Sequence, residues 1–533
     1  MLGGIEELAD PTGGSMDAVK GAVIGPYWES RVKPVGVKTA IERCGHSGSG
    51  PVALWTVIGI LTAGLLSFGQ VGAFSEGFHL LAAQLVKAGK RPYIDFFYQH
   101  SPLFLYVYAG WMRLFGESWR SVNVLSAALS AAAIALVAEF VYGRVRDPRW
   151  RQASGITAAL LMGLNFLVIQ WGTMAHPFPL CLMFSVLGFR LVIASVHQNG
   201  GAQPMAAGLC AGAAAAVSLL AAPVVPISML WMAWYNETGK RLKKAAQFLG
   251  GAAVPFLPLL WLAVQAPRRV FFDVVGYHLF HRSAGDTRLN IFWHDLRVLI
   301  AWLGSTQTLV LVLLAAVGLL FLTDRREWDA GRRAEFSLSF WLIVGLGIFL
   351  TTPHPTFLQY FVLLGPFLSI LASVGVCAIG SRVGTLRQPA WFVVPVVGLF
   401  AMGLVTSAYQ ERRYLHSYWG QIEALAQEVD RVTPSDGLIF AQEAVYFVAR
   451  RVPPPGLENS YAGDLQLPPV LAASLHVVPQ QEIDEWLASG RLATVLIAAD
   501  DPRVELLGLR RLYRQEKMFE GNYLFWGQTS RSE

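Results

Sequence analysis

The sequence predicts a polytopic α-helical membrane protein with about eleven transmembrane helices, followed by a smaller C-terminal α/β domain. Three observations lead to this fold class. Hydrophobic residues make up 54% of the 533 residues, and charged residues only 15%. Apolar runs of about 20 residues, the length that crosses a bilayer, recur along the chain. Arginine and lysine cluster in short loops beside these runs, as topology determinants do, so the net charge of +6 indicates no nucleic-acid partner.

Residues 1–50 are polar and glycine-rich, and we expect a flexible cytoplasmic arm without a cleavable signal peptide. The transmembrane domain is expected over 51–409. Its predicted crossings are 52–73, 119–142, 155–174, 178–195, two short helices that prolines separate within 205–235, 245–265, 298–322, 336–350, 357–379 and 390–408. An odd number of crossings places the N-terminus inside and the C-terminus outside. Every arginine-rich loop then falls on the inner face.

Residues 410–533 are the predicted extracytoplasmic α/β domain. Short apolar runs such as ATVLIAAD alternate with helical patterns such as EIDEWLASGR, which is typical of mixed α/β structure. Two roles stay open for this domain: recognition of an acceptor, or a lid and packing element.

Three loops are expected on the outer face, 74–102, 266–297 and 351–356, and they hold the candidate site. Glu76 follows the first crossing closely, where a carboxylate is costly unless water, a cation or a reaction uses it. Glu76 and Asp95 are the candidate catalytic acids. The candidate substrate-binding residues are His100, Arg268, Arg269, His281, Arg282, His354, Gln359 and Tyr360. Acids, cations and aromatic residues at one membrane face suit a phosphate, a hydroxylated ring and an apolar tail, the parts of a polyprenyl-phosphate sugar.

Each candidate also has a structural interpretation. Glu76 can cap a helix or pair with a nearby cation, and Asp95 can cap a juxtamembrane helix. His100 and His354 lie near prolines and can satisfy backbone groups. The arginines at 268 and 269 lie just outside a crossing, where they can anchor to lipid headgroups.

Several segments resemble the GT-C glycosyltransferases. The resemblance is to the family 39-like branch, which includes protein O-mannosyltransferases and the lipid A aminoarabinose transferase. It rests on Glu76 after the first crossing, on AxxLVKAGKRPYIDF, on QHSPLFLYVYAGWMRLFG and on the late HPTFLQYFVLLGPFLSILA.

The resemblance implies transfer of a sugar from a lipid phosphate to an acceptor hydroxyl on the exoplasmic side, with inversion. Where the family often has two adjacent acids, this chain has Ser75 and Glu76. Glu76 is therefore the expected general base, and a metal held by an acidic pair is not expected. The sugar, the carrier (undecaprenyl or dolichyl) and the acceptor (lipid, polysaccharide or protein) stay open. The expected location is the bacterial inner membrane.

Two other classes of protein are alternatives. A transporter or flippase of lipid-linked saccharide would share the topology, but the two halves show no repeat and the polar residues gather at one face instead of the midplane. A noncatalytic scaffold of the cell envelope is the second alternative. No GxGxxG, P-loop or HExxH pattern predicts a cofactor. The four cysteines are scattered and form neither a disulfide framework nor a CxxC metal site.

Overall fold

The structure is a computed structural model that describes residues 50–70, 76–197, 201–282, 286–324, 328–383, 388–410, 418–463, 465, 467–519 and 521–528. These residues belong to one compact unit, 47–533. The predicted N-terminal arm lies outside the described residues, except for its last position.

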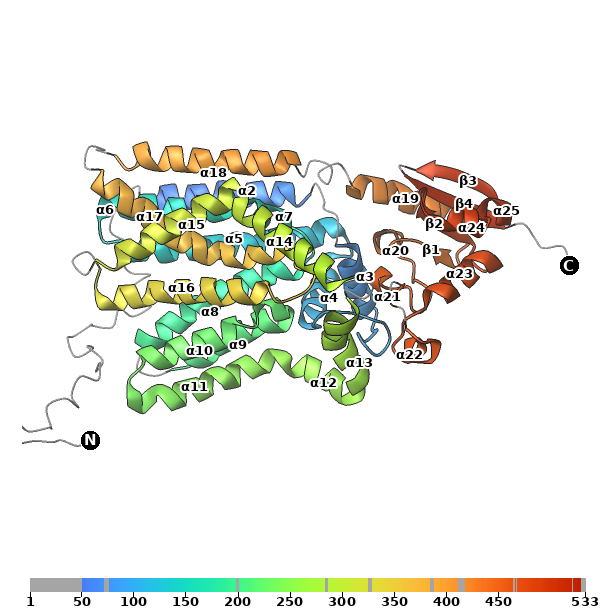
Figure 1. Cartoon of the computed structure of the whole chain (residues 1–533), viewed down its shortest axis with the longest axis horizontal. Coiled ribbons are helices and arrows are strands. Elements are labelled where there is room, and N and C mark those ends of the chain that lie inside the picture. The colour runs from blue at the N-terminus through green and yellow to red at the C-terminus, as the bar shows by residue number, and fades with distance from the viewer. Residues whose placement is uncertain are drawn as a thin grey trace, which may run out of the picture. The chain divides into compact units, whose positions relative to one another are not determined.

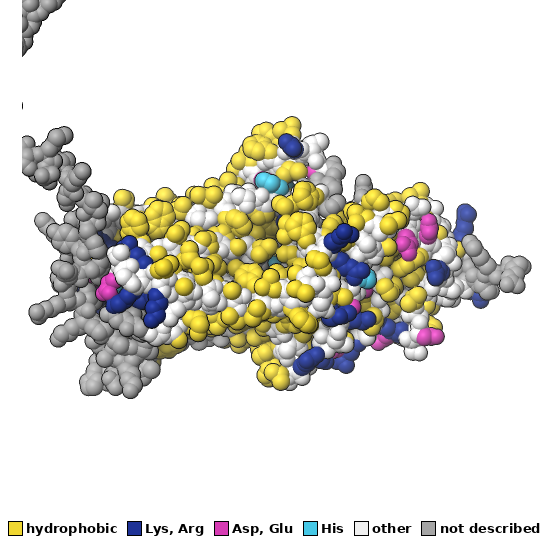
Figure 2. Space-filling view, turned by 90° about the horizontal axis from the view of Figure 1, so that it is seen from below, with side chains coloured by type: hydrophobic (Ala, Val, Ile, Leu, Met, Phe, Trp, Pro, Cys, Tyr) yellow, Lys and Arg dark blue, Asp and Glu magenta, His cyan; other side chains and the backbone are white. Residues whose placement is uncertain are grey.

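Seven helical segments of the described chain are long and apolar enough to cross a membrane. They are α2 (Gly50–Phe68), α5 (Trp119–Arg144), α8 (Pro177–His197), α11 to α12 (Thr238–Ala253, η2 Val254–Phe256, Leu257–Gln265), α16 (Ala330–Leu350), η4 with α17 (Leu358–Leu364, Gly365–Arg382) and α18 (Ala390–Gln410). Large apolar side chains of α12 and α18 are exposed; Trp261, Val264, Trp391 and Val405 are each 68 to 79% accessible. Figure 2 shows hydrophobic side chains covering the middle of the molecule. The chain is an integral membrane protein.

Two predicted single crossings are bent pairs instead. Helices α6 (Pro148–Gly163) and α7 (Phe166–Gly172) meet at 59°, and α14 (Arg288–Gly304) and α15 (Thr306–Leu322) meet at 69°. Asn165 caps α7 by accepting from two backbone amides, and Ser305 accepts from Thr308 to cap α15. These caps satisfy the backbone groups that each break frees. Counting each pair as one span gives nine crossings within the described residues, against about eleven predicted.

Two short helices occupy 205–235 as predicted, α9 (Gln203–Val217) and α10 (Val224–Tyr235), with η1 (Leu219–Ala221) between them. Helix α17 lies at the centre of the bundle. Of the most apolar 18-residue stretch of Leu358–Arg382, 94% is buried. A Cβ on Gly375 would lie 1.9 Å from the Leu314 carbonyl oxygen, and one on Gly318 would lie 2.3 Å from that of Leu371. Glycines thus allow α15 and α17 to pack backbone against backbone.

The arginine-rich loops meet at one end of the helices. Arg144 pairs with Glu335 at 2.7 Å, Arg146 with Asp329 at 2.6 Å, and Arg382 lies 3.5 Å from an Asp324 oxygen. The loops predicted to face outward lie at the other end, beside the C-terminal segment (Figure 1).

Two of these outer loops are largely helical. The first holds α3 (Gly77–Lys87), and α4 (Leu103–Phe115) follows it. The second holds α13 (Pro267–Phe271), the π-helix η3 (Phe272–His281) and the start of α14. The π-helix forms on an apolar stretch whose Val274 and Tyr277 are buried.

The C-terminal segment carries the four described strands, β1 (Ile439–Phe440), β2 (Thr494–Ala498), β3 (Tyr513–Phe519) and β4 (Asn522–Gln528). The sheet order is β1-β2-β4-β3, with β1 parallel to β2 and the other pairs antiparallel. Its helices are α19 (Tyr418–Val432), α20 (Glu443–Ala449), α21 (Ser460–Gly463), α22 (Pro469–Ser474), α23 (Gln480–Ser489), α24 (Arg503–Leu506) and α25 (Leu509–Leu512). Helix α19 joins this segment to the bundle, because Trp419 stacks on Trp119 with ring centroids 5.0 Å apart and Glu423 pairs with Arg120.

Candidate functional site

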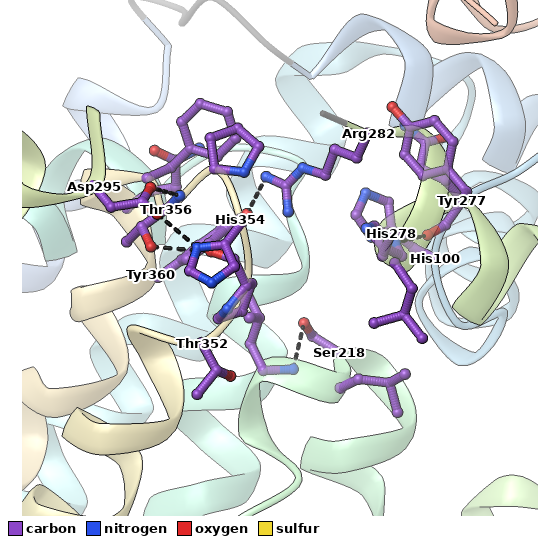
Figure 3. Close-up of a pocket in the computed structure, with 18 of the residues that line it drawn as sticks. His100, Ser218, Tyr277, His278, Arg282, Asp295, Thr352, His354, Thr356 and Tyr360 are labelled. Atoms are coloured by element: carbon purple, nitrogen blue, oxygen red, sulfur yellow. Dashed lines mark hydrogen bonds and ion pairs between the residues drawn. The ribbon is translucent and has the colours of Figure 1, made fainter. Parts of the chain in front are cut away.

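A cavity of about 1260 Å³ lies at the end of the bundle that meets the C-terminal segment. Its walls come from the turn before α4, the starts of α8 and α14, η1, the π-helix and the turn between α16 and η4 (Figure 3). One part of the wall is polar, with His100, His176, Ser218, His278, Arg282, Arg288, Asp295, His354, Gln359 and Tyr360. Another part is apolar, with Leu219, Leu220, Val275, Leu279, Phe292, Leu299 and Phe349.

Arg282, at the end of the π-helix, is held by an aromatic frame. Its guanidinium donates to the Tyr360 hydroxyl and lies 4.8 Å from the Phe357 ring centroid. These contacts fix the orientation of the guanidinium, and its other N–H groups donate to no described residue, so they can bind an anion.

Asp295 and His354 form a pair on the same wall (Figure 3). His354 Nδ1 lies 2.6 Å from one carboxylate oxygen of Asp295, and the backbone amide of Thr356 donates to the other oxygen at 2.6 Å. His294 Nε2 donates to the Thr356 carbonyl at 3.1 Å. Two neighbouring residues of α14 therefore fix the turn that carries His354.

Burial favours the neutral ring in three histidines of the cavity, His100, His176 and His278. Burial lowers the pKa of His100 well below its ordinary value, with smaller contributions from His278, His176 and Arg282. Burial also lowers the pKa of His278 to about 4 and that of His176 to about 3. Among the described lining residues, the fixed charges are thus the two arginines, 282 and 288, against the one carboxylate of Asp295. This balance favours an anionic ligand.

Five of the predicted site residues line this cavity: His100, Arg282, His354, Gln359 and Tyr360. His100, Arg282 and His354 come from the three outer loops, and Gln359 and Tyr360 follow the third loop in η4, so the structure brings these segments together. The cavity also contains His278 and Arg288, from the second of those loops.

Glu76 is not among the residues that line the cavity. Its side chain is fully buried, and Trp419 Nε1 and the Ala175 amide each donate to it at 2.6 Å, with Asn123 at 3.4 Å. Burial raises its pKa from 4.5 to about 7, against the lowering effect of these three hydrogen bonds. The expected position at an open membrane edge is therefore wrong, because α19 covers the carboxylate. Glu76 joins α19, α5 and the turn before α8.

Asp95, Arg268 and Arg269 are also not among the residues that line the cavity. Asp95 accepts from the Arg91 backbone amide at 2.7 Å and from its guanidinium; it lies in a turn and does not cap a helix, contrary to the structural interpretation. Arg268 is exposed. Arg269 donates to the carbonyl oxygens of Ser474 and Ile94, at 2.7 and 3.0 Å, and so ties the first outer loop to the C-terminal segment. The side chain of His281 lies outside the described part of the chain.

Sequence reasoning missed Asp295, His176 and Ser218. Asp295 lies in the stretch FWHDLR, and its neighbour His294 was the only local signal of a polar patch on an apolar helix. His176 lies in the stretch MAHPFP, between the predicted crossings 155–174 and 178–195. Within the described residues, no group of three or more His, Cys, Asp or Glu side chains is placed to hold a metal ion.

The chain shares its fold with solved structures of ArnT, which agrees with the predicted polytopic helical membrane fold and with the resemblance noted in the sequence; the predicted count of about eleven crossings is not confirmed. The structure of ArnT from Cupriavidus metallidurans bound to undecaprenyl phosphate matches with a TM-score of 0.59 and 14% identity, covering 90% of this chain and 98% of that chain. The apo state of the same ArnT matches with a TM-score of 0.58 and 14% identity, covering 89% of this chain and 98% of that chain. No family model and no curated protein matches the sequence.

Proposed function

We propose that this protein is a membrane glycosyltransferase that moves a sugar from a polyprenyl-phosphate donor to an acceptor hydroxyl, with inversion, in the cavity described above. The proposal depends on one observation. An arginine of fixed orientation, Arg282, and an apolar wall line the same cavity. A fold shared with a solved protein that was captured with undecaprenyl phosphate supports the same substrate class.

The donor's phosphate is assigned to Arg282 and Arg288. In this reaction the leaving group is already a phosphate, so it needs stabilisation of negative charge more than a proton. Guanidinium groups match phosphate geometry through paired N–H donors. The three neutral histidines add hydrogen-bonding capacity for sugar hydroxyls without adding charge.

The isoprenoid chain is assigned to the apolar wall. Leu219, Leu279, Phe292 and Phe349 line the same cavity as the arginines, so an apolar tail and its phosphate can lie in one continuous space. Because lipid tails are as apolar as this wall, the isoprenoid chain would bind it through van der Waals packing. The cavity end of the bundle is opposite the arginine-rich loops, which supports an exoplasmic site.

Glu76 is not retained as the general base. Both of its oxygens already accept short hydrogen bonds, and it does not line the cavity. We assign it the structural task of fastening α19 to the bundle.

The test uses the purified full-length protein in nanodiscs with undecaprenyl phosphate carrying mannose, arabinose or aminoarabinose. Lipid, polysaccharide and protein fractions of a cell envelope serve separately as acceptors. The expected result is release of undecaprenyl phosphate that depends on one acceptor fraction. Movement of an intact donor across vesicles without release would instead support the transporter alternative.

The matched variants for this test are Arg282→Gln and Arg268→Gln. Loss of a charged hydrogen-bond donor costs about 1.5–3 kcal/mol, so Arg282→Gln should weaken binding of undecaprenyl phosphate about tenfold or more. Arg268→Gln removes an exposed arginine outside the cavity and should leave binding within about twofold of wild type. Equal binding by both variants would contradict the assignment of the phosphate to Arg282.

A further inference from the structure

Because Glu76 is not the general base, the group that takes the proton from the acceptor hydroxyl is still unassigned. Such a group must reach into the cavity, hold a free basic atom there and be fixed in orientation. Among the side chains that line the cavity, Asp295 and His354 together meet these conditions.

The pair is arranged so that one histidine nitrogen is free. His354 Nδ1 lies 2.6 Å from an Asp295 oxygen, which places a proton on Nδ1 because a carboxylate only accepts. In the neutral ring, Nε2 then carries the lone pair. Nε2 makes no hydrogen bond within the described part of the chain, and the side chain is 56% exposed.

The groups that hold Asp295 and His354 in place are more buried than the ring of His354. Thr356, whose amide donates to Asp295, is 2% exposed. Its hydroxyl donates to the Pro353 carbonyl at 3.0 Å, and His294 donates to its carbonyl at 3.1 Å. The Asp295 side chain is itself only 16% exposed. Buried contacts on both sides of the turn therefore hold the ring in one orientation, as a base in a preorganised site requires.

We infer that His354 is the general base of the transfer, and that Asp295 positions its ring and stabilises the imidazolium; this inference rests on the proposed function. The acceptor hydroxyl oxygen forms a bond to the anomeric carbon as the bond from that carbon to the phosphate oxygen breaks. The bonding electron pair leaves with undecaprenyl phosphate, whose charge Arg282 and Arg288 stabilise. The hydroxyl proton moves to His354 Nε2 and then to water.

The test compares turnover with binding in the full-length protein, using undecaprenyl phosphate as the binding probe. His354→Ala should lower kcat by about 10² to 10⁴-fold, the range typical of a lost general base. Its affinity for undecaprenyl phosphate should stay within about threefold of wild type. Added imidazole should restore part of the lost kcat in His354→Ala, which a purely structural role of the histidine would not allow.

Asp295→Asn tests the positioning role. It should lower kcat at least about tenfold with little change in KM, and imidazole should not rescue it because His354 still occupies its place. Asp430→Asn is the matched control, since Asp430 is an exposed carboxylate paired with Arg451 outside the cavity, and its kcat should equal that of wild type.

The outcomes separate the two proposals. If the wild-type protein releases no undecaprenyl phosphate with any donor or acceptor, the proposed function is rejected and the role of the pair is rejected with it. If wild type is active and His354→Ala keeps its kcat, or loses kcat only in proportion to lost lipid binding, the assignment of the base is rejected and the proposed function stands.

Discussion

Replacing Glu76 with glutamine tests whether this buried carboxylate fastens α19 to the helix bundle. Glutamine has nearly the same shape, but one of its two terminal groups donates instead of accepting. Both oxygens of Glu76 accept in the structure, one from Trp419 Nε1 and the other from the Ala175 amide, each at 2.6 Å. Either orientation of the amide therefore leaves one buried donor without an acceptor. We expect the substitution to cost about 1–3 kcal/mol of stability at pH 8, where the carboxyl is mostly ionised.

This cost should depend on pH. Burial raises the pKa of Glu76 from 4.5 to about 7 in the folded protein. Because the folded pKa lies above the unfolded one, the folded state binds the proton more tightly. Wild type therefore loses stability as pH rises from 4.5 through 7, by about 3 kcal/mol in total. The variant does not titrate at this position, so the deficit of Glu76→Gln should be largest near pH 5 and smallest near pH 8.

The assay is thermal unfolding in one detergent at pH 5, 6, 7 and 8, followed by tryptophan fluorescence. Glu482→Gln, at an exposed acid of α23, is the control and should add no pH dependence. A difference between wild type and Glu76→Gln that stays constant from pH 5 to pH 8 would refute the reasoning. Turnover per folded molecule of Glu76→Gln should stay within about tenfold of wild type. A loss of about 10² to 10⁴-fold without a change in thermal unfolding would instead indicate that Glu76 is the general base.

Three further substitutions follow from the same structure. Trp419→Phe removes a donor to Glu76 and should destabilise the protein by about 1.5–3 kcal/mol; it should also move the pH-dependent loss of stability above pH 7 in the same unfolding assay. Gly375→Ala would place a Cβ 1.9 Å from the Leu314 carbonyl oxygen, so the yield of folded protein in size-exclusion chromatography should fall sharply. Arg282→Lys keeps the charge but loses the fork of donors that matches phosphate, and we expect about tenfold weaker binding of undecaprenyl phosphate in nanodiscs.

Much of the membrane architecture could be predicted from the sequence, because crossing a bilayer requires a long apolar helix. The runs that became α2, α5, α8, α16 and α18 were found in this way. The two bent pairs were not, because single small polar residues, Asn165 and Ser305, cap the second helix of each pair inside an otherwise apolar run. Hydrophobicity averaged over a crossing does not register one capping residue.

The candidate site was predictable where its residues are close in sequence. His354, Gln359 and Tyr360 share one short segment and line the cavity together. The position of Glu76 was not predictable, because the group that covers it, Trp419, lies 343 residues away. A local pattern also gave no reason to join Asp295 to a histidine 59 residues later.

The most direct measurement is an experimental structure of the protein with undecaprenyl phosphate bound in a nanodisc. We expect the phosphate within hydrogen-bonding distance of Arg282 or Arg288, with the isoprenoid chain along the apolar wall that contains Leu279 and Phe292. A phosphate bound beside Glu76, or anywhere outside the cavity, would contradict the proposed site.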